Sequence, residues 1–183
     1  RGDNKVLFLD GGDTWQGSYT SLKTNGQDMV DCMKLLKPDA MVGHWEFTFG
    51  EDRVKEIIDD MGYAFLASIF FDNEWDEPVF DSTAMFEKGG VKVAVIGLAM
   101  PFTPIANPRW MIPDWSFGIR PDFIQSNVDA ARAAGAEVVV LLSHNGFDVD
   151  RKVASTVSGI DVILTGHTHD AVPRAVEVGG TLI

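Results

Sequence analysis

Residues 137–146 read Glu-Val-Val-Val-Leu-Leu-Ser-His-Asn-Gly, and the fold prediction depends on this stretch. Residues 137–142 consist of Glu137 and five consecutive apolar residues, a run typical of a β-strand that is buried on both faces. Apolar side chains recur at helical spacing in residues 122–134 before it and in residues 148–158 after it. A second apolar run at residues 160–164 completes a helix–strand–helix–strand series. Such a series is typical of an α/β layer with a parallel sheet.

The same alternation continues through the N-terminal half of the chain. Further strands are predicted at residues 6–9, 40–42, 64–67, 79–87 and 91–98, helices at residues 28–37 and 51–61, and one or two last strands within residues 172–183. Residues 101–121 contain five prolines, two tryptophans and no periodicity, so we predict a long surface loop there. The sequence therefore predicts an α/β fold, a layered sandwich with largely parallel central strands flanked by helices.

The composition limits the possible partners. The chain carries a net charge of −12 at pH 7, which repels the phosphates of nucleic acids and anionic membrane surfaces. Its apolar runs are shorter than the ~20 residues of a membrane-spanning helix. We therefore expect no nucleic acid and no membrane among its partners. An anionic substrate would require local positive charge, and a bound metal ion is one source of it.

The single cysteine, Cys32, excludes an internal disulfide and a thiolate metal site. Its position within the helix predicted at residues 28–37 predicts a buried side chain rather than a nucleophile. The candidate metal ligands are therefore histidines and carboxylates.

Each of the four histidines follows a predicted strand, and Asp13 follows the first strand in a Gly-Asp turn; the histidines are His44, His144, His167 and His169. Functional residues of α/β sheets collect at the carboxyl ends of the strands, so we expect these five side chains to converge. His167 and His169 lie two residues apart, and in an extended segment such residues point to the same side. The sequence therefore predicts a metal site formed by these five residues.

The predicted ligand set constrains the metal. One carboxylate and four imidazoles suit Mn²⁺, Zn²⁺ or Fe²⁺ better than softer ions, and we expect Mn²⁺ first among them. Five ligands exceed the four of a tetrahedral ion, and two ions bridged by Asp13 would explain the surplus. Such a pair, ~3.5–4 Å apart, holds a hydroxide and clamps the oxygens of a tetrahedral anion. The predicted chemistry is hydrolysis of a phosphate-like or sulfate-like group.

Residues 12–18 (GDTWQGS), residues 42–48 (VGHWEFT), His144 and residues 166–169 (GHTH) resemble successive motifs of the calcineurin-like metallophosphoesterases. Within that superfamily they resemble the 5′-nucleotidase branch, and in particular the SoxB-type thiosulfohydrolases of periplasmic sulfur oxidation. The resemblance covers nearly the whole chain and implies a metallophosphoesterase-like sandwich. It also implies that residues 1–183 are an internal fragment, a partial catalytic domain without the family's first metal motif (Asp-x-His) and C-terminal substrate domain.

The resemblance further implies a role for each predicted ligand. Asp13 would bridge the two ions, His169 would bind one ion, and the other three histidines would bind the second. The implied partner is a sulfur-carrier protein with a thiosulfonate on a cysteine, and the implied location is the periplasm.

The turn at residues 43–46 departs from the nucleotidases, in which it reads Gly-Asn-His-Glu, with Asn as a ligand and His as the catalytic acid. Here His44 stands at the ligand position and Trp45 at the acid position. Glu46 is expected to orient its own turn or a ligand imidazole rather than to react. Similar proteins also carry Asn where this chain has Ile69, which leaves the loop after that strand undecided.

No catalytic side chain is assigned, and Trp45 is a candidate to lie beside the substrate, with simple packing under the turn as the alternative. A nucleotidase expels an alkoxide and needs a proton donor, whereas a thiosulfonate expels a persulfide anion, a weaker base that can leave unprotonated. The missing acid therefore favours a thiosulfohydrolase, in which hydroxide held by the ions attacks the terminal sulfonate sulfur and sulfate leaves. A 5′-nucleotidase and an inactive metal-binding interaction module stay open as alternatives.

Overall fold

The computed structural model describes residues 2–183, and its largest sheet contains six strands. Their spatial order is β10 (Glu177–Val178), β11 (Thr181–Leu182), β9 (Val162–Thr165), β8 (Val138–Ser143), β6 (Val91–Leu98) and β5 (Thr83–Lys88). The four inner strands are parallel, whereas β5 and β10 pair antiparallel at the edges. β5 and β6 form a hairpin joined at Gly89 and Gly90.

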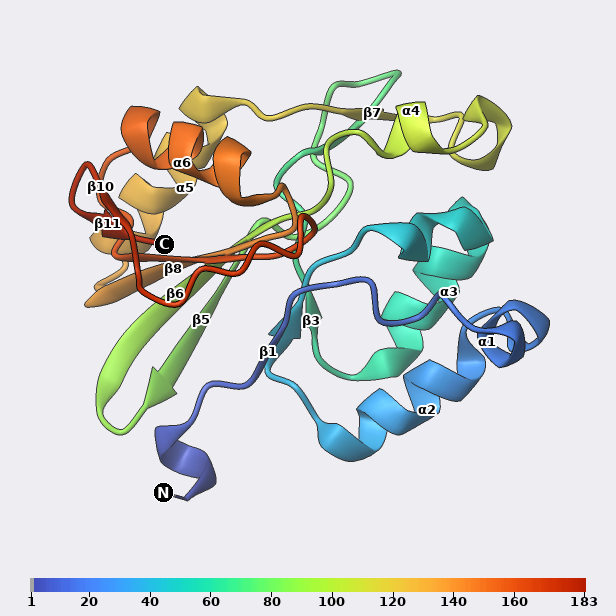
Figure 1. Cartoon of the computed structure of the whole chain (residues 1–183), viewed down its shortest axis with the longest axis horizontal. Helices are drawn as coiled ribbons and strands as arrows, with labels where there is room; N and C mark the ends of the chain where they lie inside the picture. Colours follow the sequence, from blue (N-terminus) through green and yellow to red (C-terminus); the bar gives the residue numbers. More distant parts are fainter. Residues whose placement is uncertain (1) are drawn as a thin grey trace.

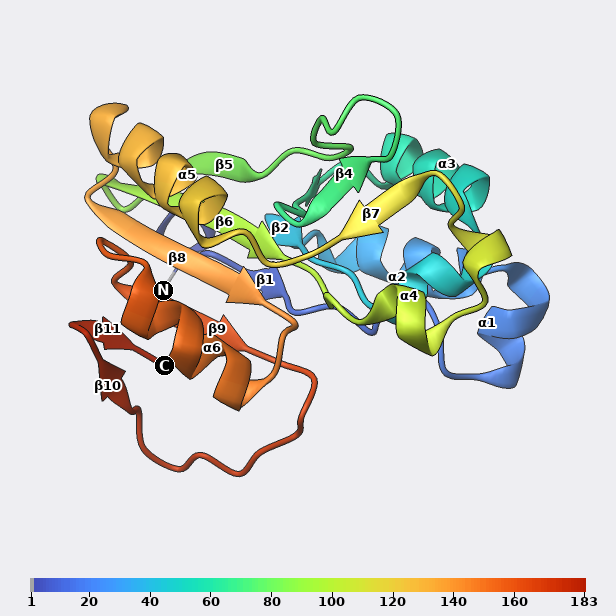
Figure 2. The same cartoon turned by 90° about the horizontal axis from the view of Figure 1, so that it is seen from above.

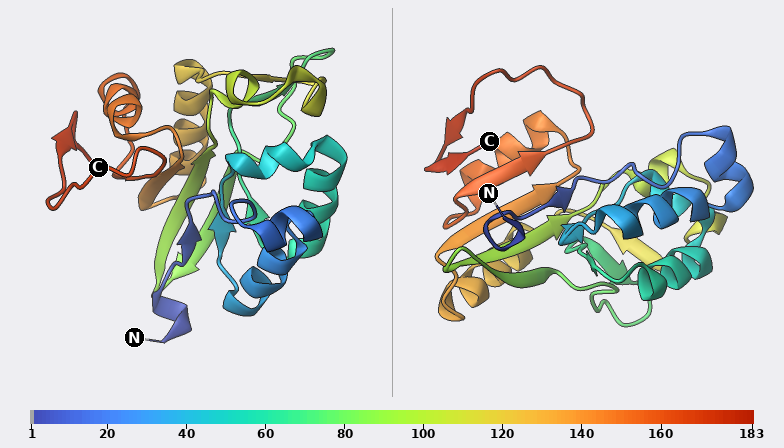
Figure 3. Two further views of the ribbon diagram at one scale, coloured as in Figure 1. Left: turned by 45° about the vertical axis from the view of Figure 1, so that its right-hand side comes forward. Right: turned by 90° about the horizontal axis from the view of Figure 1, so that it is seen from below.

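A smaller parallel sheet lies against one face of the large one (Figure 3). It consists of β1 (Leu9–Asp10), β2 (Ala40–Met41) and β3 (Ala64–Phe65). The layer between the two sheets is apolar, and its buried side chains are Ala40, Val42 and Leu66 from the small-sheet side and Val95, Val140 and Leu142 from the large sheet. Because strand side chains alternate between the faces, Val139 and Leu141 belong to the core on the opposite face.

Helices cover both outer faces of this pair of sheets (Figures 1 and 2). On the large sheet these are α5 (Pro121–Ala133) and α6 (Phe147–Thr156), and on the small sheet α2 (Gln27–Leu36) and α3 (Glu51–Met61). The short α1 (Tyr19–Thr24) precedes α2. The predicted α/β sandwich with parallel central strands flanked by helices is therefore confirmed.

Residues 101–121 contradict the prediction of a loop without secondary structure. They form α4 (Thr103–Ala106), the 3-10 turn η3 (Arg109–Met111) and β7 (Trp115–Phe117), and β7 pairs antiparallel with β4 (Phe70–Asp72). The rings of Trp115 and Phe117 pack against Phe47 and Phe70, with ring centroids 4.2–6.3 Å apart. This burial stabilises a strand that the local sequence does not reveal.

Two smaller predictions are also wrong. The strand expected at residues 6–9 begins only at Leu9, because the Phe8 N–H donates to the Asp39 side chain instead of to a neighbouring strand. Val6 and Phe8, which follow the 3-10 turn η1 (Asp3–Lys5), are exposed. Cys32 lies in a helix as predicted, but its side chain is exposed, because the buried positions of α2 are Val30 and Met33 on another side of that helix.

No helix within the described residues 2–183 is both long and apolar enough to cross a membrane.

Candidate metal centre

The five predicted ligands lie in loops at the carboxyl ends of four strands from two different sheets. Asp13 follows β1 and His44 follows β2 of the small sheet, whereas His144 follows β8 and the His167–His169 pair follows β9 of the large sheet. The packing of the two sheets therefore brings the loops together.

Three histidines form a compact group. One nitrogen from each of His44, His144 and His167 lies within 4.8 Å of the others. Asp13 reaches two of them, with Oδ1 3.1 Å from His44 Nδ1 and Oδ2 3.2 Å from His144 Nε2. His44 and His144 are only 2% and 4% exposed. The structure thus brings together four of the five predicted ligands, with His44 and His144 buried and Asp13 and His167 partly exposed.

The donor atoms of this group fit a cation. His144 Nδ1 lies 2.5 Å from the Gly11 carbonyl oxygen, and a neutral ring that donates there directs the lone pair of Nε2 toward Asp13. His44 Nδ1 is buried without a hydrogen-bond partner among the described residues. Nitrogen lone pairs facing a carboxylate are unfavourable unless a proton or a metal ion lies between them.

The pKa shifts within the group differ in direction. Burial acts to lower the pKa of His144, but hydrogen bonds with Asp13 and the Gly11 carbonyl outweigh it and raise that pKa. Burial acts to raise the pKa of Asp13, but the nearby imidazoles of His144 and His44 outweigh it and hold that pKa well below its usual range. Burial and the neighbouring His44 and His144 lower the pKa of His167. An ionised Asp13 beside a neutral His167 is the protonation state that metal coordination requires.

Several of these residues adopt an uncommon backbone conformation. Asp13, His167 and His169 have φ of 63°, 83° and 54°, in the left-handed region that residues other than glycine rarely adopt. Before Asp13, Gly12 has φ of 90°, and a Cβ there would lie 2.9 Å from the Val42 carbonyl oxygen. Such strain tends to persist where function requires a particular side-chain direction.

The Glu46 side chain hydrogen-bonds to both the turn that carries Asp13 and the turn that carries His44. It lies in the 3-10 turn η2 (Trp45–Phe49) and is fully buried. Its Oε2 accepts the N–H of His44 at 2.6 Å, and its Oε1 accepts the N–H groups of Thr14 and Trp15 at 2.6 and 3.2 Å. Burial raises the pKa of Glu46, while these N–H groups oppose the rise. The structure therefore shows that Glu46 orients its own turn, as predicted, and also the turn that carries Asp13.

Replacing Glu46 with glutamine is expected to lower the free energy of unfolding by about 2 kcal/mol, because a buried amide would face a backbone N–H where a carboxylate oxygen now accepts it. Urea unfolding of the metal-free chain measures this. Glu137→Gln is the matched control, since Glu137 is exposed and accepts one N–H, from Lys92. Equal losses in the two variants would contradict the special role of Glu46.

Besides His44, two residues depart from the patterns of similar proteins, Trp45 and Ile69, and their surroundings differ. The ring of the half-buried Trp45 stacks on His44 with ring centroids 4.6 Å apart. The backbone N–H of Trp45, not its indole, donates to Asp13 Oδ1 at 3.2 Å. Trp45 therefore packs within the site at the level of the ligands. Ile69 is fully buried in the hydrophobic core and offers no polar atom to the site.

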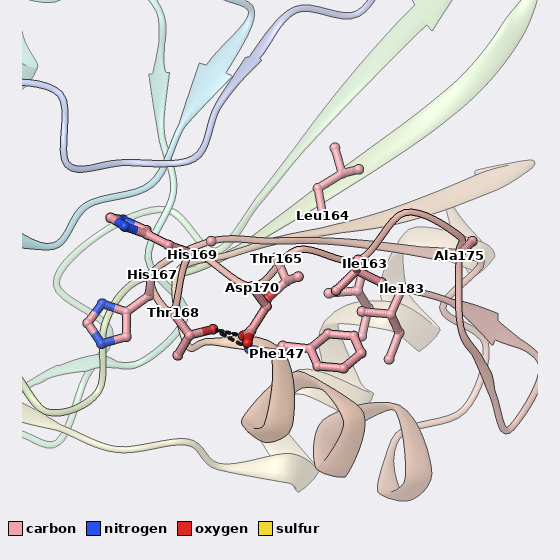
Figure 4. A pocket seen from close by; sticks show the side chains of 12 residues that line it. Phe147, Ile163, Leu164, Thr165, His167, Thr168, His169, Asp170, Ala175 and Ile183 are labelled. Atoms are coloured by element: carbon pink, nitrogen blue, oxygen red, sulfur yellow. Dashed lines mark hydrogen bonds between the residues drawn. The ribbon is translucent and has the colours of Figure 1, made fainter.

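His169 is exposed and lies outside the compact group of three histidines. It lines a cavity of about 620 Å³ between β9 and the following segment (Figure 4). In Figure 4, His167 and His169 lie at one end of this cavity, away from the apolar Ile163 and Ile183. Thr168 between them hydrogen-bonds to Asp170 and accepts the Phe147 N–H. Metal binding by His169 stays a prediction.

Sequence reasoning missed Asp10 as part of the site. Its Oδ1 accepts the Gly12 N–H at 3.0 Å and the Thr14 hydroxyl at 2.8 Å, which shapes the turn that presents Asp13. The available signal was a carboxylate directly after an apolar run, two residues before a glycine.

Comparison with known proteins gives similarities over nearly the whole chain. No family model matches the sequence. The structure of the sulfate thiohydrolase SoxB from Thermus thermophilus in complex with glycerol superposes with a TM-score of 0.92 and 41% identity, over 95% of this chain and 32% of that chain. A 5′-nucleotidase precursor from Thermus thermophilus superposes with a TM-score of 0.83 and 27% identity, over 96% of this chain and 38% of that one.

The fold is that of a metallophosphoesterase. The 5′-nucleotidase of Mus musculus is 28% identical over 171 residues, which cover 90% of this chain and 29% of the mouse protein. The likeness supports the superfamily of 5′-nucleotidases and calcineurin-like phosphoesterases, whose members are metal-dependent hydrolases. The metallophosphoesterase fold implies divalent metal ions, and the histidine group described above could bind one. The chain spans about a third of the length of these relatives.

Proposed function

We propose that this chain is the metal-binding part of a thiosulfohydrolase that releases sulfate from a thiosulfonate on a cysteine of a sulfur-carrier protein. Asp13 would bridge two divalent ions, with His44, His144 and His167 on one ion and His169 on the other. Bound there, the ions would supply Lewis-acid chemistry and an activated water. Mn²⁺ is the proposed metal, with Zn²⁺ and Fe²⁺ as alternatives that the same ligands suit.

The chain's own residues would prepare the site for an anion. Asp13 stays ionised, and Glu46 fixes the spacing of the turns that carry Asp13 and His44. The buried positions of His44 and His144 limit access of bulk water to the ligands. A protein with a net charge of −12 needs such a local cation to attract a sulfonate.

The observation that carries the proposal is Trp45 in the position of the nucleotidase acid. Its indole N–H is a donor that does not titrate, so Trp45 cannot protonate a leaving group. Its ring stacks on His44 instead. A persulfide leaving group tolerates the loss of an acid, and an alkoxide does not. The likeness to the SoxB structure at 41% identity supports the same choice.

Exchanging the pair, His44→Asn together with Trp45→His in the full-length protein, is expected to raise the hydrolysis of nucleoside monophosphates by about 100-fold, the usual contribution of a positioned general acid. Phosphate release from AMP and sulfate release from a carrier-bound thiosulfonate would be measured side by side. Trp45→Phe is the control, since it keeps an aromatic ring and adds no acid.

High AMP hydrolysis by the protein with Trp45 in place would contradict this proposal. It would favour a 5′-nucleotidase, the activity named for several similar proteins. Full metal loading without hydrolysis of either substrate would favour an inactive metal-binding interaction module. A periplasmic location, and a catalytic domain that extends beyond residues 1–183, belong to the same proposal.

A further inference from the structure

Asp150 is a fully buried carboxylate in the first turn of α6, beneath the loop that carries His144. Its hydrogen-bond partners are neutral side chains rather than a lysine or an arginine. A buried carboxylate without a cationic partner is costly, and an apolar side chain at this position would pack with less penalty. The position of Asp150 at the N-terminus of a ten-residue helix offsets part of that cost.

One oxygen of Asp150 holds both neighbours of His144. Its Oδ1 accepts the Ser143 hydroxyl at 2.7 Å and the Asn145 side-chain amide at 3.1 Å. The Asn145 N–H in turn donates to the Ser143 hydroxyl oxygen at 3.2 Å. The His144 N–H donates to the Leu98 carbonyl at 2.8 Å. Hydrogen bonds with the Asp150 side chain therefore hold Ser143 and Asn145, the residues on both sides of His144.

The Thr165 side chain, at the end of β9, also lies near the Asp150 carboxyl group. Thr165 is the residue that pairs with Ser143 in the register of β8 and β9. Asp150 Oδ2 and the Thr165 hydroxyl are both buried, and neither has a hydrogen-bond partner among the described residues. Burial raises the pKa of Asp150, and the Thr165 hydroxyl is the strongest of the groups that oppose the rise. Thr165 is the last residue of β9 and stands two positions before His167. Between them, the Gly166 N–H donates to the Ser143 carbonyl at 2.9 Å.

We propose that Asp150 is a positioning residue of the metal centre, which ties the end of β8 to the end of β9 and so sets the separation of His144 and His167. The proposal rests on the proposed metal site. Glu46 joins the Asp13 and His44 turns in the small sheet, and Asp150 plays the corresponding part in the large sheet. Neither carboxylate touches the reacting atoms in this scheme.

Asp150→Asn tests the proposal, with Co²⁺ and Zn²⁺ as the probes. We expect about tenfold weaker Zn²⁺ binding by titration calorimetry, the usual scale for a group that orients a ligand, and a changed Co²⁺ absorption spectrum. Asp148→Asn is the matched control, because Asp148 lies in the same turn of α6 with a side chain 94% exposed. It should bind both metals as the unaltered chain does. Thermal unfolding of the metal-free proteins is measured alongside.

Two further variants keep the test decisive if Asp150→Asn does not fold. Ser143→Ala removes a hydrogen bond to Asp150, and Thr165→Val removes the neighbouring buried hydroxyl. Each variant is expected to weaken Zn²⁺ binding, as Asp150→Asn does. Unchanged Zn²⁺ affinity and an unchanged Co²⁺ spectrum, with only a lower unfolding temperature, would overturn the proposal. If the unaltered chain itself binds neither metal, the metal centre fails and Asp150 loses its role with it.

Discussion

Replacing Asp13 with asparagine is expected to weaken the binding of Mn²⁺ and Zn²⁺ by more than about 100-fold. This is a larger loss than the removal of a group that only orients a metal ligand would cause. Asp13 is the carboxylate that faces both His44 and His144, at 3.1 and 3.2 Å. Asparagine keeps one oxygen but removes the negative charge that balances a divalent ion among imidazoles. Its amide group would also face one of these nitrogens.

Titration calorimetry and metal analysis of the purified chain measure this effect, and circular dichroism checks that the variant is folded. Asp59→Asn is the control, since Asp59 is exposed on α3. Binding should also weaken as the pH falls, because protons compete with the metal for imidazole nitrogens. Unchanged metal content in the Asp13 variant would contradict the assignment of the site.

Replacing Gly97 with alanine is expected to lower the free energy of unfolding by about 3 kcal/mol, at the upper end of the range for overpacking a core. A Cβ at Gly97 would lie 2.3 Å from the Leu66 Cβ and 2.4 Å from the Leu66 carbonyl oxygen. Neither the Gly97 backbone nor the Leu66 backbone can move away easily, because both are hydrogen-bonded to neighbouring residues. The Gly97 N–H donates to Ser82, its carbonyl accepts the Ser68 N–H, and the Leu66 N–H donates to Met41.

Urea unfolding measures this loss, and Gly118→Ala is the matched control because a Cβ at Gly118 would meet no atom within 4 Å. The metal site should suffer too, since the neighbouring Leu98 carbonyl accepts the His144 N–H. Similar unfolding free energies for the two alanine variants would show that the contact between the sheets adapts to the added methyl group.

The predictions of helices and strands are confirmed where an element is buried along its whole length, on one face or on both. The helix predicted at residues 51–61 is α3, Glu51–Met61, and its buried side chains are Val54, Ile57 and Met61. The strand at residues 137–142 is β8 with a shift of one residue. The local signal of burial is the helical periodicity of apolar side chains in α3, and it is the continuous apolar run in β8, which is buried on both faces.

The wrong predictions concern segments whose structure depends on distant partners. β7 exists because Trp115 and Phe117 pack on rings contributed by residues 47 and 70. β1 begins late because the Asp39 side chain binds the backbone of Phe8. Such contacts join residues about 30 or more positions apart, and they leave no periodic trace in the sequence.

For the site, the sequence alone supplied the residue types and their places at the ends of strands, which is enough to predict an α/β fold with a histidine-rich metal site. Only the tertiary structure decided which of these side chains meet. It groups Asp13, His44, His144 and His167 and leaves His169 outside the compact group. It also reveals the buried carboxylates of Glu46 and Asp150 beneath them. The reason is physical: strand ends are encoded by local periodicity, whereas the convergence of loops from two sheets depends on how those sheets pack.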